Sequence, residues 1–237
     1  MNFREKMDRS SRRTRSRVVL ALDFSDRYDK RLKRAEQVLE DTKGYVAAVK
    51  VNHHLLLPYG LRGVESLIDA CKREQLPLIA DLKVNDIEST NLNIADSLLT
   101  FGFDAVIANP FVGKEEGLGR VIERMHSKDA GVILLVYMSH AGASEGYGLL
   151  VEGGEPLYRI FAARARDWKA DGVVVSAKSV DKIEETRAIV GNNCLIFSPG
   201  VGAQGGKTGS GPDYIIVGRS ITKSIDPLKA VQELSSF

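Results

Sequence analysis

The chain has 237 residues, 43% of them hydrophobic and 27% charged, which is enough apolar sequence to bury one full core. This composition excludes a disordered chain, no run approaches the ~18 apolar residues of a membrane span, and the first residues lack the apolar stretch of a signal peptide. We therefore expect a cytoplasmic protein that does not contact membranes. Cys71 and Cys194 lie far apart without metal-type spacing and are expected to be inert thiols.

The net charge of +2 is unevenly distributed, because the first 17 residues carry seven basic against two acidic side chains. This surplus of five leaves about −3 for the rest of the chain. One alternative is a nucleic-acid-binding arm, but no aromatic residues alternate with the arginines and no basic patch recurs later. We therefore expect no nucleic-acid partner, and interpret residues 1–16 as a basic extension that is either solvated or caps the folded domain. Glu5 and Asp8 argue against a transit peptide.

Short β-branched runs alternate with segments of helical period from residue 17 onward, which predicts repeated βα units. Eight strands are expected, at residues 18–23, 45–51, 77–83, 104–109, 131–139, 172–176, 194–198 and 214–218. Helices are expected at residues 30–41, 64–73, 88–101, 115–126, 157–169, 180–190 and 226–234. Helical crossovers between parallel strands predict an α/β fold, a single (β/α)8 TIM barrel over residues 17–237.

The seventh connection departs from this pattern. Only about fifteen Gly-rich residues separate the strands expected at 194–198 and 214–218. We therefore expect the helix after the seventh strand to be shortened or replaced by a loop, which could close over a ligand.

Charged side chains gather where the first three strands are expected to end. Asp81 and Lys83 share one face of a strand, Asp86 follows directly, and Asp23 and Lys50 belong to the first two strands. Strand ends with charged residues are often only solvated ion pairs. Because the carboxyl ends of barrel strands meet at one mouth, five such residues instead predict a concave, charged catalytic site.

The position of Lys83 between carboxylates decides which chemistry is expected of it. Nearby negative charge holds an amine as an ammonium ion, which donates a proton and is a poor nucleophile. A Schiff-base aldolase needs a lysine that loses its proton easily, so this pattern argues against one. The cluster is better suited to a reaction that develops a carbanion beside the lysine, such as replacement of a carboxylate by a proton.

The C-terminal part has features of a phosphate site. The Gly-rich segment Ser198-Pro-Gly-Val-Gly-Ala-Gln-Gly-Gly206 follows the seventh strand, and Gly218-Arg219 ends the eighth. Loops at these two places commonly hold a phosphate in TIM barrels, here with backbone N–H groups and a guanidinium. The GxGxxG within this segment is not followed by the chain needed for a dinucleotide fold.

These motifs together resemble the orotidine 5'-monophosphate decarboxylase family, particularly its archaeal branch. The resemblance covers residues 17–237 and rests on Asp81-x-Lys83-x-x-Asp86-Ile87-x-x-Thr90, Met138-Ser139-His140, the Ser198–Gly206 segment and Ile216-Val-Gly-Arg219-Ser220, with Asp23 and Lys50. DxKxxD alone is shared with sugar-phosphate decarboxylases and synthases. The resemblance implies conversion of orotidine 5'-monophosphate to UMP and CO2 in de novo pyrimidine biosynthesis, with no metal or organic cofactor.

The resemblance also implies a role for each matching residue. Lys83 would protonate C6, Asp81 would face the departing carboxylate, Asp86 would complete the charged array and Lys50 would hold Asp81. The implied substrate-binding residues are Asp23, Ile87, Thr90, Ser139, Pro199, Gln204, Gly218 and Arg219. The family resemblance further implies a homodimer in which Asp86, Ile87 and Thr90 enter the neighbouring subunit's site.

Two alternatives remain open from the sequence. A metal-dependent sugar-phosphate decarboxylase or synthase of the same fold would use Asp81 and Asp86 around Mg²⁺. A non-catalytic phosphate- or nucleic-acid-binding module would use Arg219 and the basic extension. His53, His54 and His140 are interpreted as second-layer or surface residues and not as metal ligands, because no acid or third histidine stands at ligand spacing.

Overall fold

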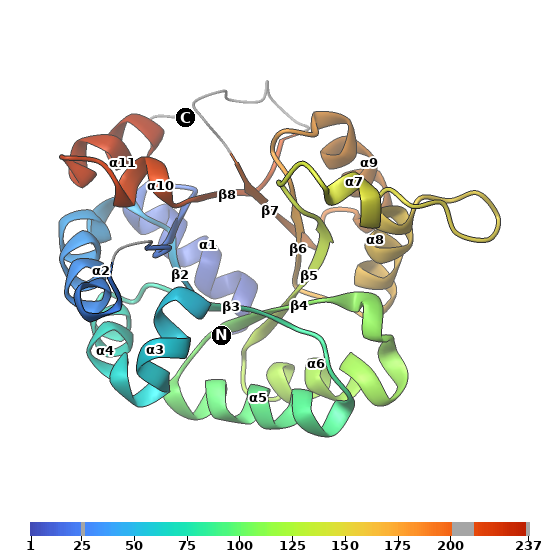
Figure 1. The fold of residues 1–237 in the computed structure, drawn as a ribbon, viewed down its shortest axis with the longest axis horizontal. Helices are drawn as coiled ribbons and strands as arrows, with labels where there is room; N and C mark the ends of the chain where they lie inside the picture. The colour runs from blue at the N-terminus through green and yellow to red at the C-terminus, as the bar shows by residue number, and fades with distance from the viewer. Residues whose placement is uncertain (25–26, 201–210, 236–237) are drawn as a thin grey trace.

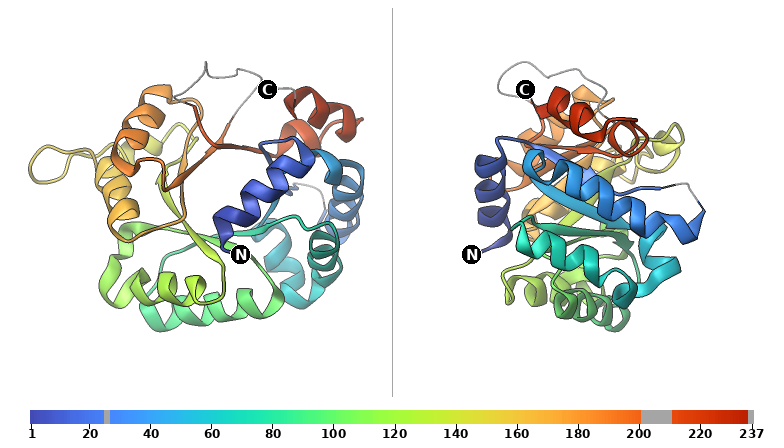
Figure 2. Two further views of the ribbon diagram at one scale, coloured as in Figure 1. Left: turned by 180° about the vertical axis from the view of Figure 1, so that it is seen from behind. Right: turned by 90° about the vertical axis from the view of Figure 1, so that its left-hand side faces the viewer.

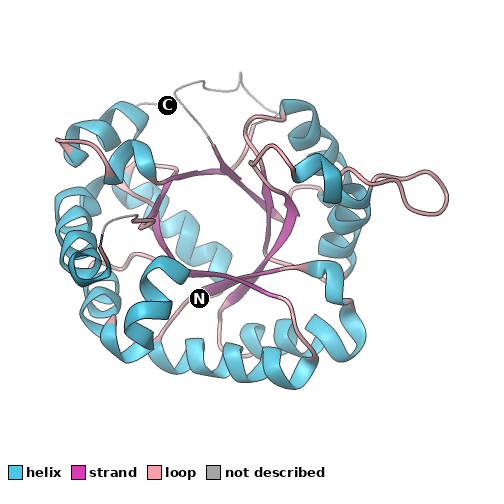
Figure 3. Cartoon of the chain, viewed as in Figure 1, coloured by secondary structure: helices cyan, strands magenta, loops and turns pink. Residues whose placement is uncertain are grey.

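The computed structural model describes residues 1–24, 27–200 and 211–235. Within them, parallel strands close into a barrel in the chain order β1 to β8, with helices around the outside (Figures 1 and 3). The TIM barrel expected from the sequence is therefore confirmed. The strands are β1 Val18–Ala21, β2 Ala48–Asn52, β3 Leu78–Val84, β4 Ala105–Ala108, β5 Gly131–Tyr137, β6 Gly172–Val175, β7 Leu195–Pro199 and β8 Tyr214–Val217.

All seven predicted helices are present, those at residues 88–101 and 180–190 with the predicted ends and the others with shifted ends, and further helical segments accompany them. The helices are α1 Phe3–Thr14, α2 Tyr28–Thr42, α3 His53–Gly63, α4 Glu65–Arg73, α5 Glu88–Phe101, α6 Gly119–His126, α7 Ala143–Gly146, α8 Leu157–Asp167, α9 Val180–Val190, α10 Arg219–Thr222 and α11 Pro227–Ser235. Two 3-10 turns, η1 Lys43–Tyr45 and η2 Pro110–Val112, and the π-type segment η3 Lys114–Leu118 lie between them. Most of the seventh connection lies outside the described residues.

Several predicted boundaries were wrong for local reasons. β1 ends at Ala21 because the N–H of Asp23 turns back to the carbonyl of Ala21 at 2.9 Å, so Asp23 lies beyond the strand. Lys50 lies inside β2, two residues before its end. Glu116 has φ +49°, a left-handed conformation that delays α6 until Gly119.

The barrel interior and the outer layer are filled by alternate residues of each strand. On β5, Ile133 and Leu135 belong to the inner cluster, whereas Val132 and Leu134 pack under the helices. This alternation is the period-2 rule of strands applied to a closed sheet. It leaves the carboxyl ends of the strands free for the loops that carry polar side chains.

Helix α1 closes the opposite end of the barrel. In Figure 2, left, it lies across the amino ends of the strands. Phe3 and Met7 are fully buried, and the Phe3 ring lies 6.3 Å from that of Phe197. Gly131 is required there, because a Cβ on it would lie 2.7 Å from the Phe3 ring. From the sequence, the basic extension is interpreted as either solvated or capping the domain. Helix α1 caps the barrel, and its arginines lie at the surface.

Three aspartates repeat one arrangement at this closed end. Each carboxylate accepts a hydrogen bond of 2.7–2.9 Å from a backbone N–H near the start of the preceding strand, and each also meets a basic side chain. The pairs are Lys6–Asp104 at 2.8 Å, His126–Asp171 at 2.9 Å and Arg187–Asp213 at 2.5 Å. These contacts fasten α1, α6 and α9 to strand starts.

In the part of the chain that is described, no helix is long and apolar enough to cross a membrane. Cys71 and Cys194 are free and buried, and burial raises the pKa of each thiol to about 12. Both thiols are therefore protonated at neutral pH, as expected for inert cysteines.

Candidate active site

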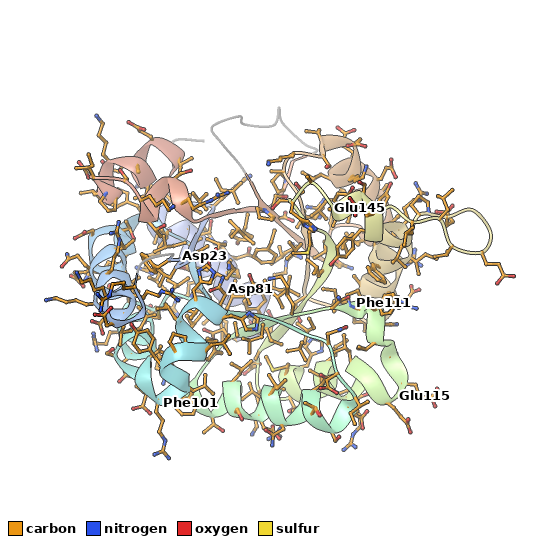
Figure 4. All side chains as sticks on the ribbon, in the orientation of Figure 1. Asp23, Asp81, Phe101, Phe111, Glu115 and Glu145 are labelled. Carbon is orange, nitrogen blue, oxygen red and sulfur yellow. The ribbon has the colours of Figure 1, made fainter. Side chains whose placement is uncertain are left out.

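A cavity of about 570 Å³ opens at the carboxyl ends of the strands. Its apolar floor comes from the inner barrel layer, including Ile107, Leu135 and Val174. Of the residues predicted for the site, eight line it: Asp23, Lys50, Asp81, Lys83, Ser139, Pro199, Gly218 and Arg219. Figure 4 places Asp23 and Asp81 within the ring of strands, whereas Phe111 and Glu115 lie at its periphery.

Two lysines share one carboxylate on one side of this cavity. Lys50 Nζ lies 2.7 Å from Asp81 Oδ2, and Lys83 Nζ lies 2.7 Å from Asp81 Oδ1. Lys50 also contacts Asp23 at 3.3 Å. The side chains of Lys50 and Asp81 are only 4% and 11% exposed, whereas that of Lys83 is 35% exposed. Lys83 is therefore the member of this array that both the cavity and solvent can reach.

Mutual attraction keeps the buried members of the array ionised. Burial opposes ionisation of Asp81, but Lys50 and then Lys83 outweigh it and lower the pKa of the carboxyl below its usual range. Burial likewise opposes the charge on Lys50, but Asp81 and Asp23 outweigh it and raise the pKa of the amine. The array therefore places fixed charges at the cavity wall without needing a bound ligand.

The backbone of β3 is irregular at Lys83. Lys83 has φ +49°, in the left-handed region that residues other than Gly rarely adopt. The pairing of β3 with β4 also shifts between Ala80 and Val84. The regular alternation that predicted a shared face for Asp81 and Lys83 therefore stops at Lys83. The two side chains still meet, with Lys83 Nζ 2.7 Å from Asp81 Oδ1. Strain of this kind is typical of functional positions.

The other side of the cavity is formed by the residues after β7 and β8. Gly200 has φ +91°, which favours glycine, and a Cβ added to it would lie 3.5 Å from Cβ of Ser139. Arg219 and Ser220 belong to α10, whose last residue Thr222 is buried and accepts a hydrogen bond at its carbonyl from the guanidinium of Arg34 at 2.8 Å. The α10 turn is thus fixed from its far end. Gln204 lies outside the described residues.

Three predicted site residues do not reach the cavity within one chain. Asp86, Ile87 and Thr90 are exposed, and Ile87 has 65% of its surface accessible. The carboxylate of Asp86 accepts the N–H of Ile87 at 2.7 Å, and no ion pair joins it to Lys83 among the described residues. The expected position of Lys83 between two carboxylates is therefore half fulfilled in a single chain, by Asp81.

Some contributors were missed from the sequence. Asn91 is fully buried, accepts the N–H of Asp86 at 3.1 Å and donates to the carbonyls of Asp86 and Gly117, so it fixes the exposed turn. His54, Ser220 and Lys223 line the cavity. The interpretation of His54 as a second-layer or surface residue overlooked this position. These residues reach the cavity because the β2–α3 and α10 turns lie at its mouth, which the sequence alone does not indicate.

A metal ion in a protein is usually held by several His, Cys, Asp or Glu side chains that lie close together. Across residues 1–24, 27–200 and 211–235, no group of three or more such side chains is placed to hold a metal ion. Both oxygens of Asp81 are occupied by lysine ammonium groups, which would repel a divalent cation.

Comparisons with known proteins agree with this geometry. A model of the orotidine 5'-phosphate decarboxylase / HUMPS family matches residues 16–234. Orotidine 5'-phosphate decarboxylase of Methanosarcina barkeri is 35% identical over 226 residues, 94% of each chain. That of Pyrococcus abyssi is 37% identical over 221 residues, 92% of this chain and 96% of its own. The crystal structure of orotidine 5'-monophosphate decarboxylase from Methanocaldococcus jannaschii, complexed with the inhibitor BMP, has a TM-score of 0.74 at 30% identity and covers 93% of this chain and 97% of its own.

Proposed function

The chain belongs to the orotidine 5'-phosphate decarboxylase / HUMPS family, and on this premise we propose that it converts orotidine 5'-monophosphate to UMP and CO2 in de novo pyrimidine biosynthesis. The observation that carries the proposal is the array of Lys50, Asp81 and Lys83 at the wall of a cavity that also contains Arg219. One end of this cavity suits a reacting carboxylate beside an ammonium group, and the other suits a phosphate.

In the proposed reaction, Lys83 and Asp81 act on the reacting carbon. The bond between C6 and the carboxylate breaks, CO2 leaves and the electron pair remains on C6. The Lys83 ammonium, 2.7 Å from Asp81, stabilises this carbanion and then transfers its proton to C6. Asp81 faces the substrate carboxylate, and its negative charge favours loss of that group. Because Lys83 is partly exposed, it regains a proton from solvent.

The remaining residues are proposed to bind and orient the substrate. Lys50 holds Asp81, since its buried amine contacts that carboxylate and Asp23. Asp23 binds a ribose hydroxyl and Ser139 reads the pyrimidine edge. The residues proposed to contact the phosphate, or to link it with the base, are Pro199, Gln204, Gly218 and Arg219.

We also propose that the active unit is a homodimer. Asp86, Ile87 and Thr90 follow β3 and are exposed, and Asn91 holds the turn at Asp86 in place. In a twofold dimer this turn would enter the neighbouring subunit's cavity and bring Asp86 to complete the array around Lys83. A symmetric dimer interface presents the same patch from both subunits, which suits such an exchange.

The metal-dependent alternative is not favoured by this arrangement. It would require Asp81 and Asp86 to share a cation, whereas Asp81 is engaged by two lysines and Asp86 faces its own backbone. We further propose a cytoplasmic enzyme in which residues 17–237 are the catalytic barrel and residues 1–16 close its far end.

The test is an absorbance assay of orotidine 5'-monophosphate consumption by purified protein treated with a chelator. Turnover that survives the chelator supports the proposal. Absence of turnover with this nucleotide would contradict it, and turnover restored only by Mg²⁺ would favour the metal-dependent alternative.

A further inference from the structure

We propose that Lys223 is a specificity-determining residue of the cavity, a second cation that works with Arg219 to favour a phosphate-bearing ligand over the corresponding nucleoside. This inference rests on the proposed function for its substrate class. Lys223 was not among the residues predicted from the sequence, and it lines the same cavity as Arg219 and Ser220.

The position of Lys223 follows from the α10 turn. Its N–H donates to the carbonyl of Arg219 at 3.1 Å, so the two residues are one helical turn apart and their side chains leave the same face. Ile221 and Thr222, which lie between them, are buried, and Arg34 holds the carbonyl of Thr222 at 2.8 Å. This anchoring presents both cations to the cavity from a fixed support.

Among the described residues, no carboxylate lies within ion-pair distance of Arg219 or Lys223. By contrast, Lys50 contacts both Asp81 and Asp23, and Lys83 contacts Asp81. Of the described residues that line the cavity, Lys50, Lys83, Arg219 and Lys223 are basic and Asp23 and Asp81 are acidic, which leaves a surplus of two positive charges. That surplus lies on the α10 side.

A phosphate monoester carries about −1.5 to −2 charges near neutral pH, so one guanidinium alone would leave it incompletely balanced. A second cation on the same turn completes the balance. Because the Lys223 side chain is exposed, its contribution is electrostatic and is reduced by added salt. The uncharged ribose hydroxyls of a nucleoside gain little from it.

The experiment compares UMP and uridine binding, by calorimetry, to the full chain and to three variants. Lys223→Met should weaken UMP binding about five- to tenfold at low salt and uridine binding less than about twofold. Lys223→Arg, which keeps the charge, should remain close to wild type. Lys229→Met, an exposed lysine on α11 that does not line the cavity, is the matched control and should change neither affinity.

Inorganic phosphate provides a second probe, because its inhibition constant against turnover should rise in Lys223→Met alone. An unchanged UMP affinity in Lys223→Met, or equal losses for UMP and uridine, would overturn the proposal. Failure of the proposed function has a different signature: the wild-type protein would then not turn over orotidine 5'-monophosphate at all, whatever residue stands at position 223.

Discussion

The ammonium group of Lys83 lies 2.7 Å from Oδ1 of Asp81, two residues earlier on the same strand. Lys83 has a left-handed backbone, so the strand is irregular at the residue that makes this contact. Because the Lys83 side chain is 35% exposed, substitutions of it should affect chemistry more than folding.

Replacing Lys83 by Ala should lower kcat by about 10³-fold or more, because it removes both the proton donor and the charge beside the carbanion. UMP binding, measured by calorimetry, should change little. Lys128→Ala, at an exposed position just after α6, is the control and should keep full activity. A near-normal rate in Lys83→Ala would reject this assignment.

Replacing Lys50 by Met should destabilise the fold by about 3 kcal/mol in urea unfolding, because Asp81 and Asp23 would lose a buried partner. Lys43→Met is a matched control, since Lys43 also contacts two carboxylates, Glu40 and Glu74, but at the surface. Its effect should be much smaller. Equal losses of stability in the two variants would show that burial does not make the Lys50 contacts more important to folding than the surface contacts of Lys43.

His126 should make stability depend on pH. Its hydrogen bond with Asp171 raises the pKa of the imidazole above 6.5, although partial burial opposes this. The stabilisation is therefore fully present below pH 6.5 and is lost as pH rises through the raised pKa. In urea unfolding, His126→Gln should lose stability relative to wild type at about pH 5.5 and much less at about pH 8.5.

The exposed His53, replaced by Gln, is the control for the His126 measurement. It should show no comparable difference between the two pH values. A loss in His126→Gln that is the same at both pH values would assign the contact to packing or a neutral hydrogen bond.

Mixing inactive Lys83→Ala and Asp86→Ala protomers should restore about a quarter of wild-type activity, because half of randomly paired dimers would contain one intact site of two. The measurement is turnover after the mixed protomers have been allowed to exchange. Each variant alone, carried through the same procedure, is the control. If no activity returns although mixed dimers form, Asp86 does not act across the interface.

Replacing Phe3 by Ala should cost about 3 kcal/mol of stability, since the ring is fully buried against Phe197 and Gly131 at the closed end of the barrel. Its kcat should stay near wild type because α1 is at the opposite end from the cavity. Arg12→Ala, an exposed change on the same helix, should be nearly neutral. Unaffected stability in Phe3→Ala would mean that α1 does not cap the barrel in solution.

The sequence predicted the barrel and most of the eight cavity-lining residues because strand period and strand ends are local patterns, whereas Ser139 was indicated only by the family resemblance. The sequence did not predict α3, because Pro58 and Gly60 interrupt its helical pattern, and Gly60 has a left-handed φ at the kink. It also missed Lys223, since nothing local tells that the α10 turn faces the mouth. Asp86 illustrates the reverse case: its position in the chain suggested the array, but a single chain leaves it exposed.

The most direct test of the central claim is a crystal structure of the protein with UMP bound. The account predicts that Lys83 Nζ lies within about 3.5 Å of the pyrimidine C6, where it could deliver a proton. A Lys83 amine turned into bulk solvent, or a nucleotide bound away from Asp81, would contradict it.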